Sequence, residues 1–176
     1  MTYIVRNQLC TKGSSTALRI DKHRLEIRFL KRIYAVEDHC IGCRLCEVHC
    51  ITQHSKSREL VRAHRKEVTT PSRVRVSEHG PISFAVQCRH CSEPACVYSC
   101  LSGAMSKDPI SGLVIHDRER CIGCWTCVMV CPVGAVIPDI TTSKVVAKCD
   151  LCADLEMPAC VQNCPNRALL FQEVPP

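Results

Sequence analysis

The chain has 176 residues, of which seventeen are cysteine and only seven are aromatic, and its formal net charge is +6. Its apolar runs are too short to span a membrane, and its N-terminus lacks the regions of a secretory signal. These features argue against a membrane-spanning chain and against a secreted disulfide scaffold. The odd cysteine count then indicates reduced thiols in the cytoplasm, available for metal or redox chemistry.

The predicted elements are short. Positive charge is concentrated in residues 1–32, which hold eight Lys or Arg against two acidic residues, while the remainder holds fifteen of each sign. Alternating apolar residues on either side of a polar turn predict that this N-terminal extension, which includes Cys10, forms a basic hairpin that docks on a partner. A disordered arm is the alternative. The later predictions are a strand at 33–37, a helix over 55–68 that Pro71 ends, strands at 73–76 and 83–86, a hairpin over 107–116, and strands at 135–137 and 168–174.

Sixteen cysteines fall into four groups of four, each with an opening C-x2-C and a closing C-x3-C. Groups one and three have the full spacing C-x2-C-x2-C-x3-C, and groups three and four are each followed by a proline, Pro132 and Pro165. The groups are Cys40, Cys43, Cys46, Cys50; Cys88, Cys91, Cys96, Cys100; Cys121, Cys124, Cys127, Cys131; and Cys149, Cys152, Cys160, Cys164.

This spacing is typical of bacterial ferredoxins, in which three thiolates hold one [4Fe–4S] cluster and the fourth cysteine reaches another. We expect the x3 step to open a helix, with the closing proline in its first turn. Two C-x2-C pairs are enough for a zinc site, which does not require the repeated C-x2-C-x2-C-x3-C spacing. We therefore expect four [4Fe–4S] clusters. Binding of the clusters would supply folding energy. Their charge, about −2 each with their thiolates, removes the positive excess that would favour nucleic acid.

Spacing alone leaves the pairing of the groups open. Residues 82–140 have the pattern of one complete ferredoxin module, which would leave groups one and four to serve each other. However, the gap of 17 residues between groups three and four is also ferredoxin-like. The alternative is therefore adjacent pairing, of group one with two and of three with four.

Residues 33–174 resemble the four-cluster electron-transfer subunits of the dimethyl-sulfoxide-reductase, formate-dehydrogenase and hydrogenase type. The resemblance is carried by C-I-G-C-R-L-C from Cys40, C-R-H-C-S-E-P-A-C from Cys88, C-I-G-C-W-T-C-V-M-V-C-P from Cys121, and C-D-L-C, P-A-C and C-P from Cys149. The stretch S-G-A-M from Ser102, with K-D-P and Trp125, is most similar to the subunit associated with carbon monoxide dehydrogenase. Residues 1–32 match no part of this family.

The resemblance implies nested pairing and an α+β fold of two bacterial-ferredoxin-like modules, with small antiparallel sheets and short helices. An inserted module of 82–140 would interrupt an outer module of 33–81 plus 141–176. The implied ligand sets are Cys40, Cys43, Cys46 and Cys164 for cluster 1; Cys149, Cys152, Cys160 and Cys50 for cluster 2; Cys88, Cys91, Cys96 and Cys131 for cluster 3; and Cys121, Cys124, Cys127 and Cys100 for cluster 4.

The resemblance also implies a non-catalytic electron-transfer subunit, and the sequence contains no nucleotide loop or nucleophile–base motif. The expected catalytic partner is a carbon monoxide dehydrogenase, a molybdenum or tungsten enzyme acting on formate or aldehyde, or a hydrogenase. A second electron-accepting subunit would complete the path, without nucleic acid and without a membrane span. A free polyferredoxin is the alternative. His39, His49 and His90 lie beside cluster cysteines, where they would either tune potentials or form ordinary polar surface. Trp125 would either shield a cluster from water or serve as ordinary packing.

Overall fold

The structure is a computed structural model that describes residues 30–67, 70–139 and 145–174. Most of the basic N-terminal extension, with its expected hairpin and Cys10, lies outside the described residues. Residues 30–32 of that extension belong to the first strand.

The described residues form four small antiparallel sheets of two strands each. The sheets pair β1 (Leu30–Ala35) with β8 (Leu169–Val174), β2 (Val74–His79) with β3 (Ile82–Gln87), β4 (Met105–Lys107) with β5 (Val114–His116), and β6 (Val136–Asp139) with β7 (Val145–Lys148). The helices are a 3-10 turn (Glu37–His39), α1 (Leu45–His54), α2 (Leu60–Arg65), α3 (Ala95–Tyr98), α4 (Thr126–Met129) and α5 (Ala159–Gln162). This is the expected α+β fold of small sheets and short helices.

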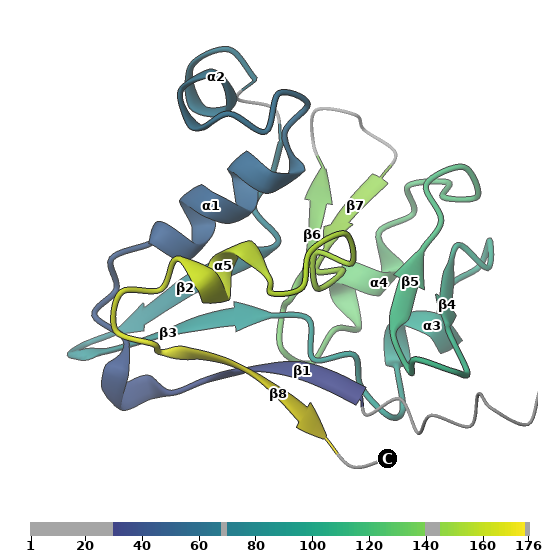
Figure 1. Ribbon diagram of the computed structural model, residues 1–176. Coiled ribbons are helices and arrows are strands. Elements are labelled where there is room, and N and C mark those ends of the chain that lie inside the picture. The colour runs from purple at the N-terminus through teal and green to yellow at the C-terminus, as the bar shows by residue number, and fades with distance from the viewer. Residues whose placement is uncertain (1–29, 68–69, 140–144, 175–176) are drawn as a thin grey trace, which may run out of the picture.

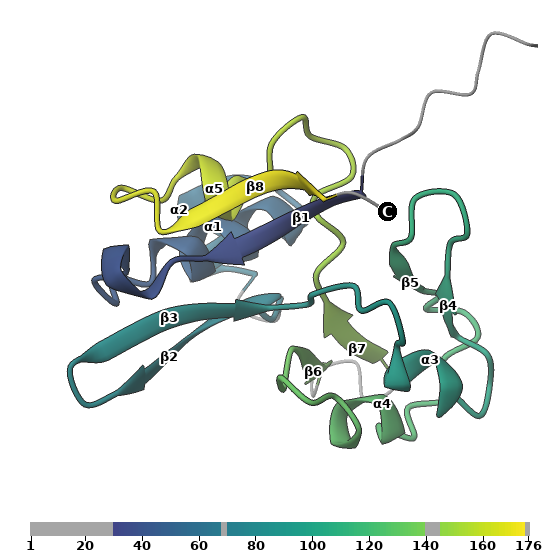
Figure 2. The same ribbon diagram turned by 90° about the horizontal axis from the view of Figure 1, so that it is seen from below.

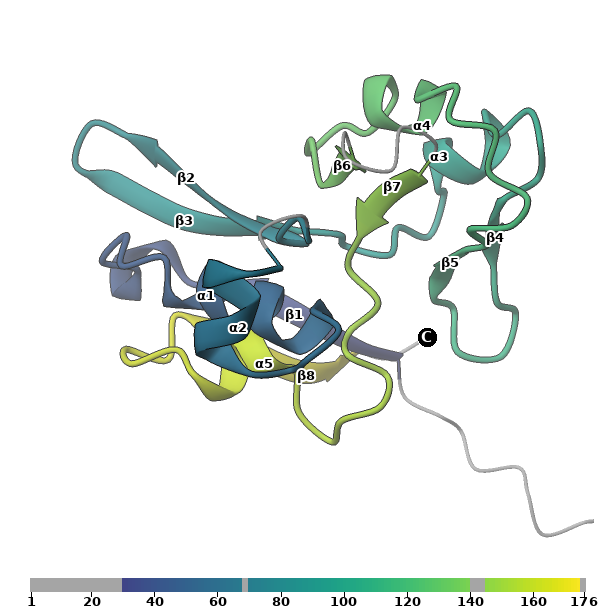
Figure 3. The same ribbon diagram turned by 90° about the horizontal axis from the view of Figure 1, so that it is seen from above.

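The elements lie in two groups. In one group, α1 and α5 lie beside the sheets β1–β8 and β2–β3; in the other, α3 and α4 lie beside β4, β5, β6 and β7 (Figures 1 and 2). The view from above separates the same two groups (Figure 3). The first and last described strands are partners, with Ile33 opposite Phe171, so the two ends of the described chain meet in one sheet.

Local sequence explains the longest hairpin. In β2 the buried residues Val74 and Val76 alternate with the exposed Arg75, as expected of a strand with one buried face. Only two residues separate β2 from β3, and the first of them, Gly80, has φ +58°. A positive φ at this position of a two-residue hairpin favours glycine.

Each group has its own buried core, and cysteines form part of both. The first core contains Ile33, Val74, Val76, Ala85, Leu151 and Leu169 together with Cys46, Cys50, Cys149 and Cys160. The second contains Met105, Val114, Val136 and Val146 together with Cys127. Thiols therefore occupy core positions that larger apolar side chains fill in other small proteins, which accounts for the few aromatic residues.

The predicted strands are mostly confirmed, whereas the predicted helix over 55–68 is wrong in its bounds. Helix α1 already ends at His54 and α2 spans only Leu60–Arg65, so Pro71 ends neither. The first strand begins at Leu30 instead of residue 33 because its pairing with β8 extends to that residue. Strand β7 was not predicted; Val146, Ala147 and Lys148 are all buried, so the segment lacks the alternation of a half-exposed strand.

Candidate metal centres

All four cysteine groups begin with the same backbone turn. The residue before the second cysteine has a left-handed conformation in each group, with φ +67° at Gly42, +46° at His90, +70° at Gly123 and +60° at Leu151. Glycine adopts this conformation readily, whereas for His90 and Leu151 it costs about 1 kcal/mol. The recurrence of the turn without glycine indicates that the loop geometry is required in every group.

A short helix then positions the third cysteine. Cys46, Cys96, Cys127 and Cys160 are each the second residue of α1, α3, α4 and α5. The x3 step is therefore helical, as predicted. The expected role of the closing prolines is wrong, because Pro132 and Pro165 follow the ends of α4 and α5. A residue that cannot continue a helix suits that position.

The first pocket joins two distant groups of cysteines. It is lined by the first three cysteines of group one and by the last cysteine of group four, with the apolar residues Val76, Ala85 and Leu169 behind them. The four cysteines are Cys40, Cys43, Cys46 and Cys164. Burial raises the pKa of Cys46 to about 12, and thiolates at Cys43 and Cys40 would raise it further.

A second set consists entirely of buried cysteines, namely Cys50, Cys149, Cys152 and Cys160. Burial raises the pKa of Cys160, and thiolates at Cys149 and Cys50 would raise it further. Burial also raises the pKa of Cys149 to about 12. Such thiols stay protonated until a metal displaces the proton, so metal loading must release protons.

A third set surrounds another pocket. Three cysteines of group two line it together with the last cysteine of group three and the proline that follows. These residues are Cys88, Cys91, Cys96, Cys131 and Pro132. Burial raises the pKa of Cys96, and thiolates at Cys88 and Cys131 would add to this.

The remaining four cysteines are Cys100, Cys121, Cys124 and Cys127, and charges on the first three would act on Cys127. Burial raises the pKa of Cys127 to about 11, and thiolates at Cys121, Cys100 and Cys124 would raise it further. At the exposed Cys124, by contrast, the Thr126 hydroxyl donates to Sγ at 3.4 Å and lowers the pKa. The structure thus brings together, in two pockets, three cysteines of one group and the last cysteine of another, and electrostatic interactions of Cys160 and Cys127 involve the remaining eight cysteines.

The last cysteine of every group accepts a hydrogen bond from a backbone N–H. The four bonds are Arg73 N to Cys50 Sγ at 3.2 Å, Met105 N to Cys100 Sγ at 3.4 Å, Ala135 N to Cys131 Sγ at 3.3 Å, and Ala168 N to Cys164 Sγ at 3.2 Å. Such bonds favour the thiolate and tune the potential of a bound iron–sulfur centre. Sets of four thiols with backbone donors directed at sulfur fit the [4Fe–4S] group.

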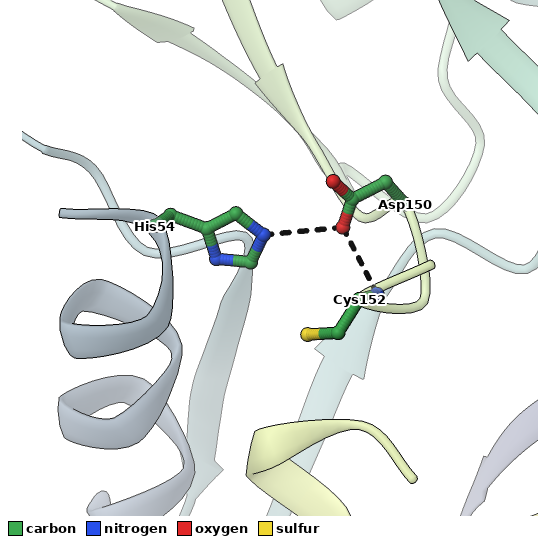
Figure 4. A group of neighbouring side chains, drawn as sticks. All are labelled: His54, Asp150 and Cys152. Atoms are coloured by element: carbon green, nitrogen blue, oxygen red, sulfur yellow. Dashed lines mark hydrogen bonds and ion pairs between the residues drawn. The ribbon is translucent and has the colours of Figure 1, made fainter. Parts of the chain in front are cut away.

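Sequence reasoning missed three side chains that support the second set. His54, one helical turn after Cys50, places Nε2 3.1 Å from Oδ1 of Asp150, and Cys152 N donates to the same oxygen at 3.1 Å (Figure 4). Arg73 binds the other oxygen of Asp150. The positions of His54 after Cys50 and of Asp150 between two cysteines are the signals that could have indicated them.

These contacts fix the imidazole of His54 between Cys50 and Asp150, beside the second set of cysteines. Its Nδ1 lies 2.8 Å from the carbonyl oxygen and 3.7 Å from Sγ of Cys50. Burial alone lowers the pKa of His54, but the bonds with Asp150 and Cys50 outweigh it and raise the pKa to about 9. His54, Asp150 and Cys152 are close enough to hold a metal ion together. However, both imidazole nitrogens already have partners, so we interpret the group as supporting structure.

The other sequence candidates differ in burial. His39 is exposed and His49 is half-buried, and Trp125 precedes α4 with 39% of its surface exposed. His90 is 1% exposed, and its Nδ1 accepts the N–H of Val114 at 3.0 Å. Burial lowers the pKa of His90 to about 3, so the imidazole is neutral. The interpretation of His90 as polar surface is therefore wrong.

Comparisons with known proteins point in the same direction as the geometry. Residues 81–174 match the family described as the 4Fe-4S dicluster domain. The electron transport protein HydN of Escherichia coli is 40% identical over 153 residues, which cover 78% of this chain and 85% of HydN. One chain of the anaerobic dimethyl sulfoxide reductase of the same species is 35% identical over 142 residues, which cover 75% of this protein and 68% of that relative.

A longer relative matches over only part of its length. The putative oxidoreductase AegA of Escherichia coli is 37% identical over 144 residues, which cover 78% of this protein but 21% of AegA. Among the helices of the described residues, none combines the length and the apolar character that a membrane crossing requires.

Proposed function

This protein belongs to the 4Fe-4S dicluster family of electron-transfer proteins, and from this we propose that it is a non-catalytic subunit that passes electrons between a catalytic redox subunit and a second carrier. Bound clusters would take up and release single electrons at potentials set by their surroundings. The observation that carries the proposal is the lining of each cysteine pocket by three residues of one group and one residue from a distant group.

The proposed ligand sets follow from these groupings. Cluster 1 would be held by Cys40, Cys43, Cys46 and Cys164, cluster 2 by Cys149, Cys152, Cys160 and Cys50, cluster 3 by Cys88, Cys91, Cys96 and Cys131, and cluster 4 by Cys121, Cys124, Cys127 and Cys100. Four clusters need sixteen thiolates, and sixteen free cysteines are present in the described residues. Free thiols in this number also favour a reducing compartment such as the cytoplasm.

Burial supports a linear order of the four centres. We number each set of cysteines after the cluster that it would hold. Cys43 of set 1 and Cys124 of set 4 are exposed, whereas all cysteines of set 2 are buried and those of set 3 are half-buried. A thiolate at Cys46 would repel one at Cys160, and a thiolate at Cys96 would repel one at Cys127. These interactions link set 1 to set 2 and set 3 to set 4. We therefore propose that electrons enter and leave through clusters 1 and 4.

Packing supports nested modules with boundaries slightly different from those expected at 82 and 140. Strand β3 pairs with β2, and its Ala85 belongs to the first core, so it fits the outer module. Strand β7 pairs with β6, and its Val146 belongs to the second core, so it fits the inserted module. We propose that the inserted module runs from Cys88 to Lys148.

The partner is proposed from the relatives. The dimethyl sulfoxide reductase relative is, by its name, one chain of a larger enzyme, which favours a catalytic partner for this protein too. A carbon monoxide dehydrogenase, a molybdenum or tungsten formate or aldehyde enzyme, and a hydrogenase are the candidate partners. Purification of the native complex tests this proposal: a co-eluting catalytic polypeptide is expected, and a chain that elutes alone from its native source supports a free polyferredoxin.

Paired substitutions test the ligand sets. In nested pairing, Cys43 and Cys164 serve one cluster, so C43A/C164A should lose a single cluster and keep about twelve iron atoms in intact centres. Its matched control, C43A/C100A, removes one ligand from each of two clusters and should convert both to three-iron centres. Adjacent pairing predicts the reverse outcome for the two variants. Iron analysis and electron paramagnetic resonance of the anaerobic proteins distinguish them.

A further inference from the structure

Lys148 lies where the chain passes from one core to the other. It is the last residue of β7; Val146 before it belongs to the second core and Cys149 after it to the first. Figure 3 shows the segment after β7 leaving one group of elements and running toward α5 in the other. Despite its long charged side chain, Lys148 is only 6% exposed.

The ammonium group of Lys148 contacts both of the inner cysteine sets. Its Nζ donates to the carbonyl oxygen of Cys149 at 2.7 Å and to Sγ of Cys88 at 3.8 Å. Cys149 belongs to set 2 and Cys88 to set 3, so a single cation touches a ligand residue of each. Because Lys148 and Cys88 lie 60 residues apart in sequence, only the folded chain creates this contact.

Among the described residues, Lys148 makes its side-chain contacts with these two cysteine residues and not with a carboxylate. The nearest acidic residue along the chain, Asp150, is bound by Arg73 and by His54. In the described part of the chain, Lys148 therefore directs its charge at a carbonyl group and at sulfur.

Lys148 also borders a cavity. The cavity has a volume of about 360 Å³, and its lining includes Arg73, Arg118, Asp150 and two histidines, His90 and His116. Its lining among the described residues includes no cysteine, so it is separate from the cysteine pockets. A charge at a buried site acts on its neighbours far more strongly than one in water.

We propose that the positive charge of Lys148 tunes electron transfer. The cation favours an added electron on the two inner centres, and it so raises their reduction potentials relative to the outer two. The inference rests on the proposed function and on its ligand sets. One electron moves from one inner set to the other, and no bond or proton changes place. Lys148 would hold both inner sets in the same positive field.

The test is a potentiometric titration of the anaerobic full-length protein, followed by electron paramagnetic resonance. K148Q keeps a hydrogen-bond donor but removes the charge, K148M removes both, and K148R keeps the charge. The exposed Lys66 provides the matched control, K66Q. We expect K148Q and K148M to shift two of the four potentials to more negative values, whereas K148R and K66Q leave all four near those of the wild type.

The outcomes separate this inference from the proposed function. Four clusters with all potentials unchanged in K148Q or K148M, whichever of the two loads fully, would overturn the role of Lys148 alone. An equal shift of all four potentials, or the same shift in K148R as in K148Q, would also overturn it. A wild-type protein that holds zinc or fewer clusters contradicts the ligand sets themselves, whatever the variants do.

Discussion

The side-chain amide of Gln87 donates through Nε2 to the carbonyl oxygen of Ile33 at 3.1 Å, and both residues are 5% exposed. This bond joins the end of β3 to β1, two strands that belong to different sheets. It also fixes the chain immediately before Cys88, the first cysteine of the second group. The strand that precedes the first cysteine group and the strand that precedes the second are thus connected through a buried polar contact as well as through apolar packing.

Removing this bond should destabilise the protein. In Gln87→Ala the carbonyl group of Ile33 is left buried without this donor, which costs about 1–3 kcal/mol. We expect a lower midpoint of anaerobic urea unfolding at unchanged iron content. Gln53→Ala is the matched control, because Gln53 makes its bond with Asp154 at the surface and its loss should cost less than about 0.5 kcal/mol. Equal midpoints for the two variants would contradict the structural role of Gln87.

The two cores predict separate routes of iron loss. Leu169 lies in the first core and Met105 in the second, both 3% exposed, and truncation of either to alanine should cost about 2–5 kcal/mol. With a chelator, Met105→Ala should release the iron of clusters 3 and 4 first, and Leu169→Ala that of clusters 1 and 2. The measurement is the time course of iron release combined with the loss of each resonance signal. Release of all four signals together in both variants would show that the cores are not independent.

The surface around the fourth set should bind the partner. Leu101, Ile122, Trp125 and Met129 are exposed apolar residues that lie within two positions of its cysteines in sequence, and Leu101 and Met129 are 79% and 85% exposed. Exposed apolar surface of this kind marks interaction sites. The double variant L101E/M129E should keep its iron but slow electron exchange with the catalytic subunit at least about tenfold, a loss of about 1.4 kcal/mol of binding. Unchanged exchange at full iron content would place the docking site elsewhere.

The sequence predicts most of the features that depend on residues close together along the chain. Three cysteines such as Cys40, Cys43 and Cys46 lie close together because their spacing leaves little choice, and the alternation of Val74 and Val76 with charged residues defines β2. The short sheets and the helical x3 step follow from the same local signals. The ferredoxin-like groups and the small α+β fold could therefore be predicted, whereas the nested pairing stays a prediction.

What the sequence did not indicate depends on contacts between distant residues. Lys148 reaches Cys88 across 60 positions, and the N–H of Arg73 reaches Cys50 across 23. Neither contact leaves a periodic pattern in the sequence. The position of the closing prolines relative to the helices was also predicted wrongly. Pro132 resembles a residue that starts a helix, but α4 ends before it.

The most direct test of the account is the metal and sulfide content of the anaerobically purified full-length chain. Four complete centres require about sixteen iron and about sixteen acid-labile sulfide per chain, with negligible zinc. A colourless protein, a zinc-loaded protein, or one that saturates at about eight iron atoms would contradict the assignment of the sixteen cysteines to four electron-carrying centres.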